Sequence, residues 1–482
     1  IVEWDNALYD FANDWVFERT DKRDNVVACS FQVATFYGWN PFAFFQWGNN
    51  LVYSNRVYNS NLRCINFSAV VNAYTIDNNF VEQLSDITTD ELANSVLIQN
   101  NLVKVGSGIT LNGDKVNATN NVLLDGSSIY TVGSYNEIGG INIVDNYLFQ
   151  STISNTFFYS GSSYLYLNQN NLKNSSIQLI GGVTILTSST ININQNNLLD
   201  SSINNYGYCN NNSQIYIKQN SLLGFGNSIT NHTILVNGSI MEINENAMNG
   251  VSNSILCEAN ACTQSSFLYI NTNTLGTNNI IQTYNTCAVS DNSMLTISDN
   301  TCGESNNIYN KSIVNISSLL NISLNTLDTS NTLYNGSAAL SAKAESNASI
   351  FITNNRLGKS NQLYNDGFSS QINSEIYLSF NSLENQNIVY NTAGCDNGSK
   401  IYIRYNALVM NTSSVASVGN IMSSLITIEN NQLQADAYIN SQGNSNSSFL
   451  NITDNNLGNG CYINQQAAID TSSTLNIDRK ST

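Results

Sequence analysis

The chain contains few of the residues that most enzymes and nucleic-acid-binding proteins use. Among 482 residues there is one His and one Pro, Pro41, and Asp, Glu, Lys and Arg together make up 11%. An average soluble domain has about 25% charged residues. A single Pro suits a body of hydrogen-bonded strands, because Pro is excluded from strand interiors. No run of 18 apolar residues occurs, so we expect no membrane-spanning helix.

Positive charge is especially scarce. The chain has 17 Lys and Arg against 34 Asp and Glu, a formal net charge of −17. Phosphate binding needs clustered Lys and Arg, so we expect no nucleic-acid partner. One His and no C-x-x-C pair exclude a Cys/His zinc site, and we expect neither metal nor cofactor. The hydrophobic fraction of 41% is too high for disorder, and Asn, Ser and Thr supply the polar surface.

One pattern, apolar-x-apolar-x-x-Asn-x-Leu, recurs every 24 to 30 residues. A fixed period in this range is typical of a solenoid, in which one unit stacks on the next. The pattern predicts a column of stacked Asn side chains, an Asn ladder. Its fourteen members are Asn121, Asn146, Asn170, Asn196, Asn220, Asn246, Asn273, Asn300, Asn325, Asn355, Asn381, Asn406, Asn431 and Asn455.

The repeat around Asn196 explains why the chain coils. Ile191 and Ile193 alternate with polar residues, so both point to one face of a strand. The alternation breaks at Gln195-Asn196, and Asn tolerates the left-handed backbone of a tight corner. Leu198 and Ile203 then point inward from later strands. We predict about three short strands per coil and about sixteen coils, with each ladder amide donating to the next.

The I-x-I-x-x-N-x-L unit resembles the right-handed parallel β-helix of pectate lyases, polygalacturonases and tailspikes, over roughly residues 70–482. The resemblance implies an all-β solenoid with an Asn ladder at a two-residue corner. Right-handed crossovers are also the general rule for parallel strands. We assign residues 66–482 to this solenoid.

The two ends of the chain differ from the repeats. Residues 1–65 hold all four Trp residues, and an apolar stripe over residues 1–15 predicts a helix. We expect this region to act as an aromatic N-terminal cap and assembly region. At the other end, Leu475 and Ile477 begin a repeat that is not completed. We expect further chain or another molecule to cover this end.

The nine Cys residues are scattered. Cys262 and Cys287 are one period apart, and neighbouring strands are spaced suitably for a disulfide. We expect them to bridge adjacent coils, and Cys29 to pair with Cys64. A Cys257–Cys262 pair and free buried thiols remain alternatives.

The sequence offers no catalytic constellation. Among the enzymes that the repeat resembles, polygalacturonases need clustered Asp residues with Gly-His-Gly and Arg-x-Lys motifs, and pectate lyases need an acidic calcium cluster with Arg or Lys bases. This chain has no Asp-Asp pair and neither motif, and its only His is His232. Glu242 and Glu245 share a coil, but adjacent coils place no second carboxylate beside them, as a glycosidase requires. We therefore expect no enzyme; a polysaccharide lyase or hydrolase using Glu242 is the least favoured alternative.

Two aromatic stripes recur in register. Phe351, Tyr377 and Tyr402 occupy the same outward position in three successive coils. They predict a surface column that either packs the sheet or contacts carbohydrate or a partner. A Tyr-Asn pair in five consecutive coils predicts a second ladder: Tyr284-Asn285, Tyr309-Asn310, Tyr334-Asn335, Tyr364-Asn365 and Tyr390-Asn391.

Fifteen Asn-x-Ser/Thr sequons occur, and no member of the Asn ladder is one of them. We predict that the protein is extracellular or on the cell surface, and that several sequons carry N-glycans. The sequons are Asn66, Asn117, Asn174, Asn211, Asn231, Asn237, Asn310, Asn315, Asn321, Asn335, Asn347, Asn397, Asn411, Asn446 and Asn451.

Together these features favour a structural protein. We expect a subunit of an extracellular, N-glycosylated filament or surface coat, in which copies join head to tail. The alternative is an adhesin or carbohydrate-binding β-helix that uses the Phe351 stripe.

Overall fold

The computed structural model describes most of residues 73–481 and, within residues 1–72, only the backbone of β1 (Val26–Val27), β2 (Asn50–Tyr53), β3 (Arg56–Tyr58) and β4 (Asn61–Arg63). The gaps are 83–85, 89–94, 112–114, 132–133, 136–138, 157, 160–161, 180–183, 186–187, 207, 259–261, 285–287, 312, 315–316, 337–346, 367–372, 385, 387, 392–394, 397, 409–413, 418–420, 435–437, 443–444, 467–469 and 471. The predicted N-terminal helix and all four Trp residues lie outside the described residues.

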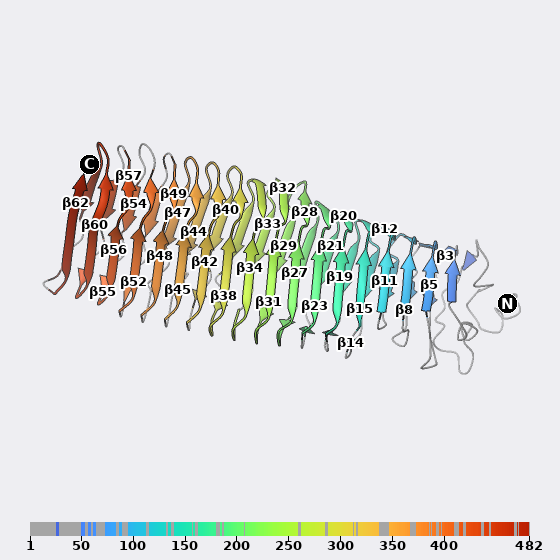
Figure 1. Cartoon of the computed structure of the whole chain (residues 1–482). Coiled ribbons are helices and arrows are strands. Elements are labelled where there is room, and N and C mark those ends of the chain that lie inside the picture. Colours follow the sequence, from blue (N-terminus) through green and yellow to red (C-terminus); the bar gives the residue numbers. More distant parts are fainter. Residues whose placement is uncertain are drawn as a thin grey trace, which may run out of the picture. The chain divides into compact units, whose positions relative to one another are not determined.

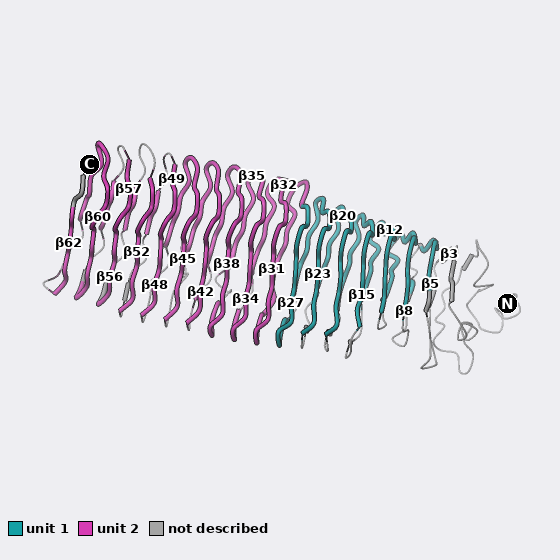
Figure 2. Tube along the Cα trace, in the orientation of Figure 1, with its two compact units in different colours: residues 1–221 teal, residues 222–482 magenta. Residues whose placement is uncertain are grey.

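The chain forms two compact units, unit 1 over Ile1–Ser221 and unit 2 over Leu222–Thr482 (Figure 2). In each unit, every described strand pairing is parallel, and each strand pairs with its counterpart about one sequence period away. The predicted all-β parallel solenoid is therefore confirmed.

A single coil of unit 1 shows the repeating element order. It runs through β15 (Gly140–Val144), β16 (Tyr147–Phe149), β17 (Thr152–Asn155) and β18 (Phe158–Tyr159). These pair in parallel with β19 (Tyr164–Asn168), β20 (Asn171–Lys173), β21 (Ser176–Leu179) and β22 (Thr184–Ile185). The coil thus has a fourth short strand beyond the three that the sequence predicted.

The first strand of each coil carries the repeated apolar-x-apolar motif. In unit 1 these opening strands are β2, β5 (Ala73–Asp77), β8 (Ser95–Gln99), β11 (Lys115–Thr119), β15, β19, β23 (Thr190–Asn194) and β27 (Gln214–Lys218). In unit 2 they are β31 (Ile240–Asn244), β34 (Phe267–Asn271), β38 (Met294–Ser298), β42 (Leu319–Ser323), β45 (Ser349–Thr353), β48 (Glu375–Ser379), β52 (Lys400–Arg404), β56 (Leu425–Glu429), β60 (Phe449–Leu457) and β62 (Thr474–Ser481). These eighteen strands are two more than the expected sixteen coils, because β2 and β62 begin coils that lack the full motif.

The interior is filled by the residues that the alternation predicts. Ile191, Ile193, Leu198 and Ile203 are all fully buried. Burial in β23 alternates strictly along the strand, as expected when one face of a sheet is covered. The apolar residues of successive coils stack into a continuous core within each unit.

The corners require left-handed backbone, but at a position different from the predicted one. The residue before each ladder Asn has positive φ, as in Gln195 (57°) and Phe380 (58°), whereas the ladder Asn does not. The left-handed residue points outward, which is why the corner admits many residue types. The ladder Asn instead turns its amide into the interior.

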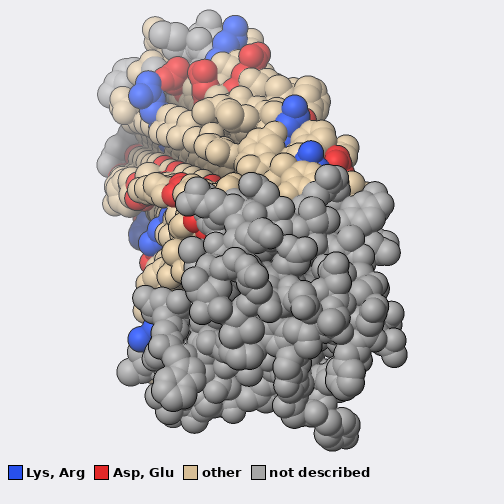
Figure 3. Space-filling view, turned by 90° about the vertical axis from the view of Figure 1, so that its right-hand side faces the viewer, with Lys and Arg blue, Asp and Glu red and all other residues tan. Residues whose placement is uncertain are grey.

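Parallel pairing begins before residue 66. Strand β2 pairs with β5, and β4 pairs with β7 (Asp86–Thr88). The remainder of the proposed cap region lies outside the described residues. Charged side chains are sparse and scattered on the face drawn in Figure 3, where most of the described surface is neither acidic nor basic. The described residues include no helix long and apolar enough to span a membrane.

Candidate functional site

The Asn ladder is the main polar structure of the interior. In unit 1, the backbone N–H and the Nδ2 group of Asn121 both donate to Oδ1 of Asn146, at 2.9 and 3.0 Å. Nδ2 of Asn146 also donates to the carbonyl of Ala118 at 3.0 Å. Each amide therefore satisfies buried main-chain groups as well as its neighbour. The same contacts run from Asn79 through Asn101 to Asn220.

Unit 2 repeats this arrangement from Asn246 to Asn455. All fourteen predicted ladder residues are at most 1% exposed. The ladder prediction is confirmed within each unit, and unit 1 extends it by two residues, Asn79 and Asn101.

A second Asn column follows the Tyr-Asn stripe of unit 2. Asn310 donates to Asn335 at 2.7 Å, Asn335 to Asn365 at 2.6 Å, and Asn365 in turn to Asn391. The predicted second ladder is thus confirmed for these four residues. The fifth predicted member, Asn285, lies outside the described residues, and the register partner of Asn310 in the preceding coil is Thr283.

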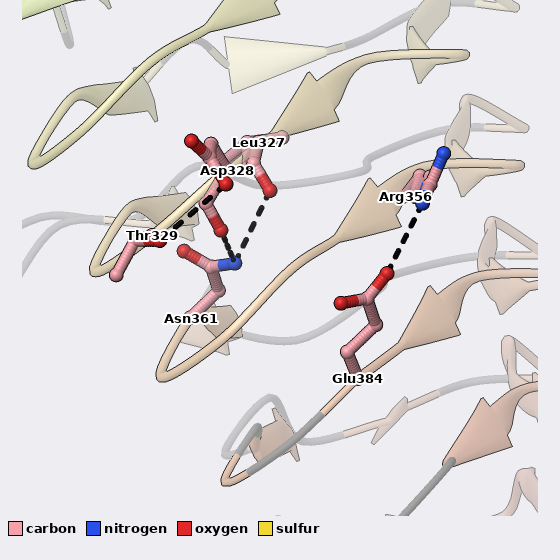
Figure 4. Close-up of polar contacts among 6 residues, drawn as sticks. All are labelled: Leu327, Asp328, Thr329, Arg356, Asn361 and Glu384. Atoms are coloured by element: carbon pink, nitrogen blue, oxygen red, sulfur yellow. Dashed lines mark hydrogen bonds and ion pairs between the residues drawn. The ribbon is translucent and has the colours of Figure 1, made fainter.

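A third Asn column, which the sequence reading missed, lies at the corner before the third strands of unit 2. Its members are Asn227, Asn253, Asn279, Asn306, Asn331 and Asn361. Asn361 Nδ2 donates to the carbonyls of Leu327 and Asp328, at 3.2 and 2.8 Å (Figure 4). Unit 1 uses Ser at this corner, as where the Ser175 N–H donates to Ser201 Oγ. The signal was a second Asn or Ser five to seven residues after the ladder Asn.

The predicted outward aromatic column forms. Phe351 stacks on Tyr377 with ring centroids 4.7 Å apart and planes 2° from parallel. Tyr377 stacks on Tyr402 at 4.8 Å and 15°. The three residues are register partners on β45, β48 and β52, which lie side by side in Figure 1. Because the inner ring faces cover one another, the column presents mainly ring edges to solvent.

Charged residues lie beside the Tyr377–Tyr402 part of the aromatic column. The Arg404 guanidinium lies 4.8 Å from the Tyr402 centroid and 5.4 Å from that of Tyr377. Such cation–π contacts stabilise by about 0.5–1 kcal/mol at exposed sites. The Tyr377 hydroxyl donates to Glu375, whose other oxygen lies 3.1 Å from Lys400 Nζ.

The ionisation of Glu375 and Tyr377 follows from these contacts. Partial burial raises the pKa of Glu375, but the hydrogen bonds from Tyr377 and Lys400 and the charges of Lys400 and Arg404 outweigh it, so the net pKa is lowered. Partial burial and the hydrogen bond to Glu375 raise the pKa of Tyr377. At neutral pH Glu375 is therefore a carboxylate, and Tyr377 is a neutral donor.

A second aromatic pair is exposed at the adjacent corner. Phe380 and Tyr405 are 53% and 44% exposed, and their rings stack at 4.9 Å and 5°. Both have positive φ, of 58° and 56°, which is uncommon for bulky residues. Gln195 and Gln219 occupy the same corner in unit 1. Exposed rings in a strained backbone conformation mark this corner as a candidate contact surface.

The structure divides the described sequons into two groups. Asn231, Asn310 and Asn335 are at most 2% exposed, and the last two belong to the second ladder. Their burial leaves no room for a glycan, so these three predicted sites are wrong. The exposed or half-buried ones are Asn117, Asn174, Asn211, Asn237, Asn321, Asn347, Asn446 and Asn451. The others, Asn66, Asn315, Asn397 and Asn411, lie outside the described residues.

The predicted Cys262–Cys287 disulfide is wrong. Cys262 and Cys257 are buried thiols that form no disulfide, which also excludes the local alternative. The register explains why, because Cys262 pairs with Val289, two residues after Cys287. Cys29 and Cys64 lie outside the described residues. Burial raises the pKa of the Cys302 thiol to about 12, so this group is inert at neutral pH.

The candidate carboxylates do not assemble into a larger cluster. Glu242 accepts a hydrogen bond from Asn244 Nδ2 at 3.1 Å, and its register partner in the next coil is Tyr269. Glu245 is exposed at the left-handed corner. In the part of the chain that the structure describes, no group of three or more His, Cys, Asp or Glu side chains is placed to hold a metal ion.

Comparison with known proteins gives little beyond these observations. No family model and no curated protein matches the chain. Among solved structures, a double mutant of the periplasmic alginate epimerase AlgG is similar at 10% identity, covering 83% of this chain and 77% of that one, with a TM-score of 0.16. A similarity this weak supports no conclusion about activity.

Proposed function

We propose that this protein is a structural, N-glycosylated subunit of an extracellular filament or surface coat. The observation that carries the proposal is that the Asn residues fall into two groups, one buried and one at the surface. Ladder Asn residues are buried and use their amides internally, whereas eight described sequons lie at the surface. Surface glycans would supply the hydration that a chain with 11% charged residues lacks.

The interior supports a scaffold role. In unit 2 the Asn ladder and a stacked apolar core join successive coils, and the second and third Asn columns add contacts over residues 310–391 and 227–361. Buried polar networks in which the side chains hydrogen-bond to one another favour one rigid arrangement. Repeats that bind only their neighbours also allow one copy to continue the pattern of another, and head-to-tail contacts of this kind produce open filaments.

The test is secretion of the full chain from a eukaryotic host, followed by intact mass measurement and electron microscopy. We expect a mass above that of the 52.8 kDa polypeptide, reduced by an endoglycosidase that removes N-glycans, and filaments at high concentration. As a matched control, Asn310→Gln should leave the glycan mass unchanged, because Asn310 is buried. A bare-polypeptide mass, or monomers alone at every concentration, would refute the proposal.

A second candidate is an adhesin or carbohydrate-binding function, which the exposed Phe380–Tyr405 corner favours. Phe380→Gln and Tyr405→Gln test it, because Gln occupies the same left-handed corner elsewhere. Loss of binding on a glycan array with unchanged thermal stability would support this function. Tyr377→Ala is the comparison, since its ring faces are largely covered.

A further inference from the structure

One surface sequon differs from the others in its neighbours across the sheet. Asn321 on β42 has Thr296 and Phe351 as its register partners. Two other sequons share this outward strand position. Asn117 lies between Leu97 and Asn142, and Asn451 lies between Thr427 and Asn476. Only Asn321, among these three, stands beside an aromatic ring.

That ring ends the aromatic column. One face of Phe351 covers Tyr377, at a centroid separation of 4.7 Å. At the other end of the column, Tyr402 has Thr427 as its next register partner, and Arg404 lies beside Tyr377 and Tyr402. The second face of Phe351 is therefore the terminal ring face at the Asn321 side. Phe351 is half-buried, so solvent reaches it.

The spacing suits a sugar ring at this place. Neighbouring strands in a sheet lie about 4.7–4.9 Å apart, which matches the repeat of the stacked rings. A pyranose ring attached to Asn321 would stand one repeat from Phe351. The C–H groups on one face of the sugar would then pack on the apolar ring face and remove it from water.

We propose that the reducing-end N-acetylhexosamine of a glycan on Asn321 packs against the outer ring face of Phe351. The glycan thereby becomes the next member of the column Phe351–Tyr377–Tyr402. The C1–Nδ2 bond forms as the C1–O bond between the glycan and a polyprenyl diphosphate breaks. Nδ2 loses a proton, and the polyprenyl diphosphate is the leaving group. This inference rests on the proposed function, in which surface sequons carry N-glycans.

The contact has a measurable consequence for the native glycoprotein. A sugar packed on Phe351 resists an N-glycan amidase, which must reach the Cγ–Nδ2 bond of Asn321 to hydrolyse it. We expect the enzyme to release the Asn321 glycan from the folded wild-type chain more slowly than the Asn451 glycan. Phe351→Leu should speed release at Asn321 roughly three- to ten-fold, the size expected when one ring contact is lost. Release at Asn451 should not change.

Two control variants accompany Phe351→Leu. Phe351→Tyr keeps the ring and should retain slow release. Tyr402→Leu removes a ring at the far end of the same column and should leave Asn321 as in the wild type. Site-resolved mass spectrometry of glycopeptides gives the occupancy and release rate at each sequon, and thermal unfolding checks that each variant folds.

The outcomes separate this inference from the proposed function. A bare Asn321 beside occupied Asn117 and Asn451, or equal release rates in wild type and Phe351→Leu, overturns the inference alone. Absence of glycans from every surface sequon overturns the proposed function as well. Faster release at Asn321 in Tyr402→Leu would contradict the inference, because the effect would not depend on the terminal ring face of Phe351.

Discussion

At the scale of single residues, asparagine has two different roles in this chain. As a ladder residue it is buried and uses its amide to satisfy carbonyls and N–H groups of adjacent coils, as Asn381 does. As a surface residue it lies on an outward strand face or at a corner, like Asn174 with its positive φ. The backbone conformation and the inward or outward direction distinguish the two roles. Residue type alone does not.

The first prediction concerns Asn381. Its Oδ1 accepts two hydrogen bonds from Asn355, and its Nδ2 donates to the carbonyl of Ile352 and to Asn406, all at about 3.0 Å. Each buried partner left unsatisfied costs about 1–3 kcal/mol. We expect Asn381→Ala to lower the free energy of unfolding by roughly 3 kcal/mol or more in a urea titration. The adjacent, exposed Ser382→Ala should change it by less than about 0.5 kcal/mol.

The second prediction concerns the left-handed corner. Leu324 has φ of 58° and is 54% exposed, while Asp299 and Asp454 hold the same corner in other coils. Left-handed backbone costs most residues roughly 1–2 kcal/mol, and Asp tolerates it better. Leu324→Asp should therefore raise the free energy of unfolding by about 1 kcal/mol, measured by urea unfolding. Leu324→Val should lower it, because a β-branched residue fits this conformation poorly; the reverse order would contradict the argument.

The third prediction concerns Cys302. Burial raises the pKa of its thiol to about 12, so the reactive thiolate is nearly absent at pH 8. We expect iodoacetamide to leave Cys302 unmodified in the folded protein and to alkylate it in urea, as read by peptide mass spectrometry. Rapid alkylation of the folded chain at pH 8 would show that the thiol is accessible and disprove this prediction.

At the scale of secondary-structure elements, the outward face of β45, β48 and β52 combines stacking with charge pairing. The sheet brings Phe351, Tyr377 and Tyr402 into register, and Glu375 then lies between the Tyr377 hydroxyl and Lys400 Nζ. The sequence predicted the ring column from its period. It did not predict the charged network, because charges contributed by neighbouring coils share no pattern along the chain.

The fourth prediction is a pH dependence of this face. The pKa of Glu375 is lower in the folded chain than in the unfolded one. A lowered carboxyl pKa contributes stability above the unfolded pKa, which is lost as the pH falls through the folded pKa. Glu375→Gln should thus reduce thermal stability at pH 7 but have a smaller effect near pH 3. An equal loss at both pH values would assign the effect to packing rather than to charge.

At the scale of the whole molecule, each unit is a stack in which a coil contacts only its neighbours. Loss of one complete period should therefore preserve the alignment of every column. In unit 2 one period separates Asn355 from Asn381. Each accepts a hydrogen bond from the ladder Asn of the preceding coil and donates one to the ladder Asn of the next coil.

The fifth prediction uses this property. Deletion of residues 356–381 removes one period and should leave a folded β protein with a cooperative thermal transition. Deletion of residues 356–368 removes half a coil and misplaces inward and outward residues, so we expect aggregation or loss of the transition. Circular dichroism and light scattering measure both outcomes. Equal tolerance of the two deletions would contradict a register fixed by the ladders.

The sequence by itself determined the period, the parallel solenoid and the residues that fill its interior. It did so because alternation and a fixed repeat leave only one way to bury Ile191 and Ile193. Tertiary structure decided three other features. It buries the sequon amide of Asn310, and it places Cys262 where it forms no disulfide. It also leaves one ring face of Phe351 without a stacked aromatic neighbour. These depend on register between coils, and a shift of two residues, invisible in the repeat, separates partners that the period alone would join.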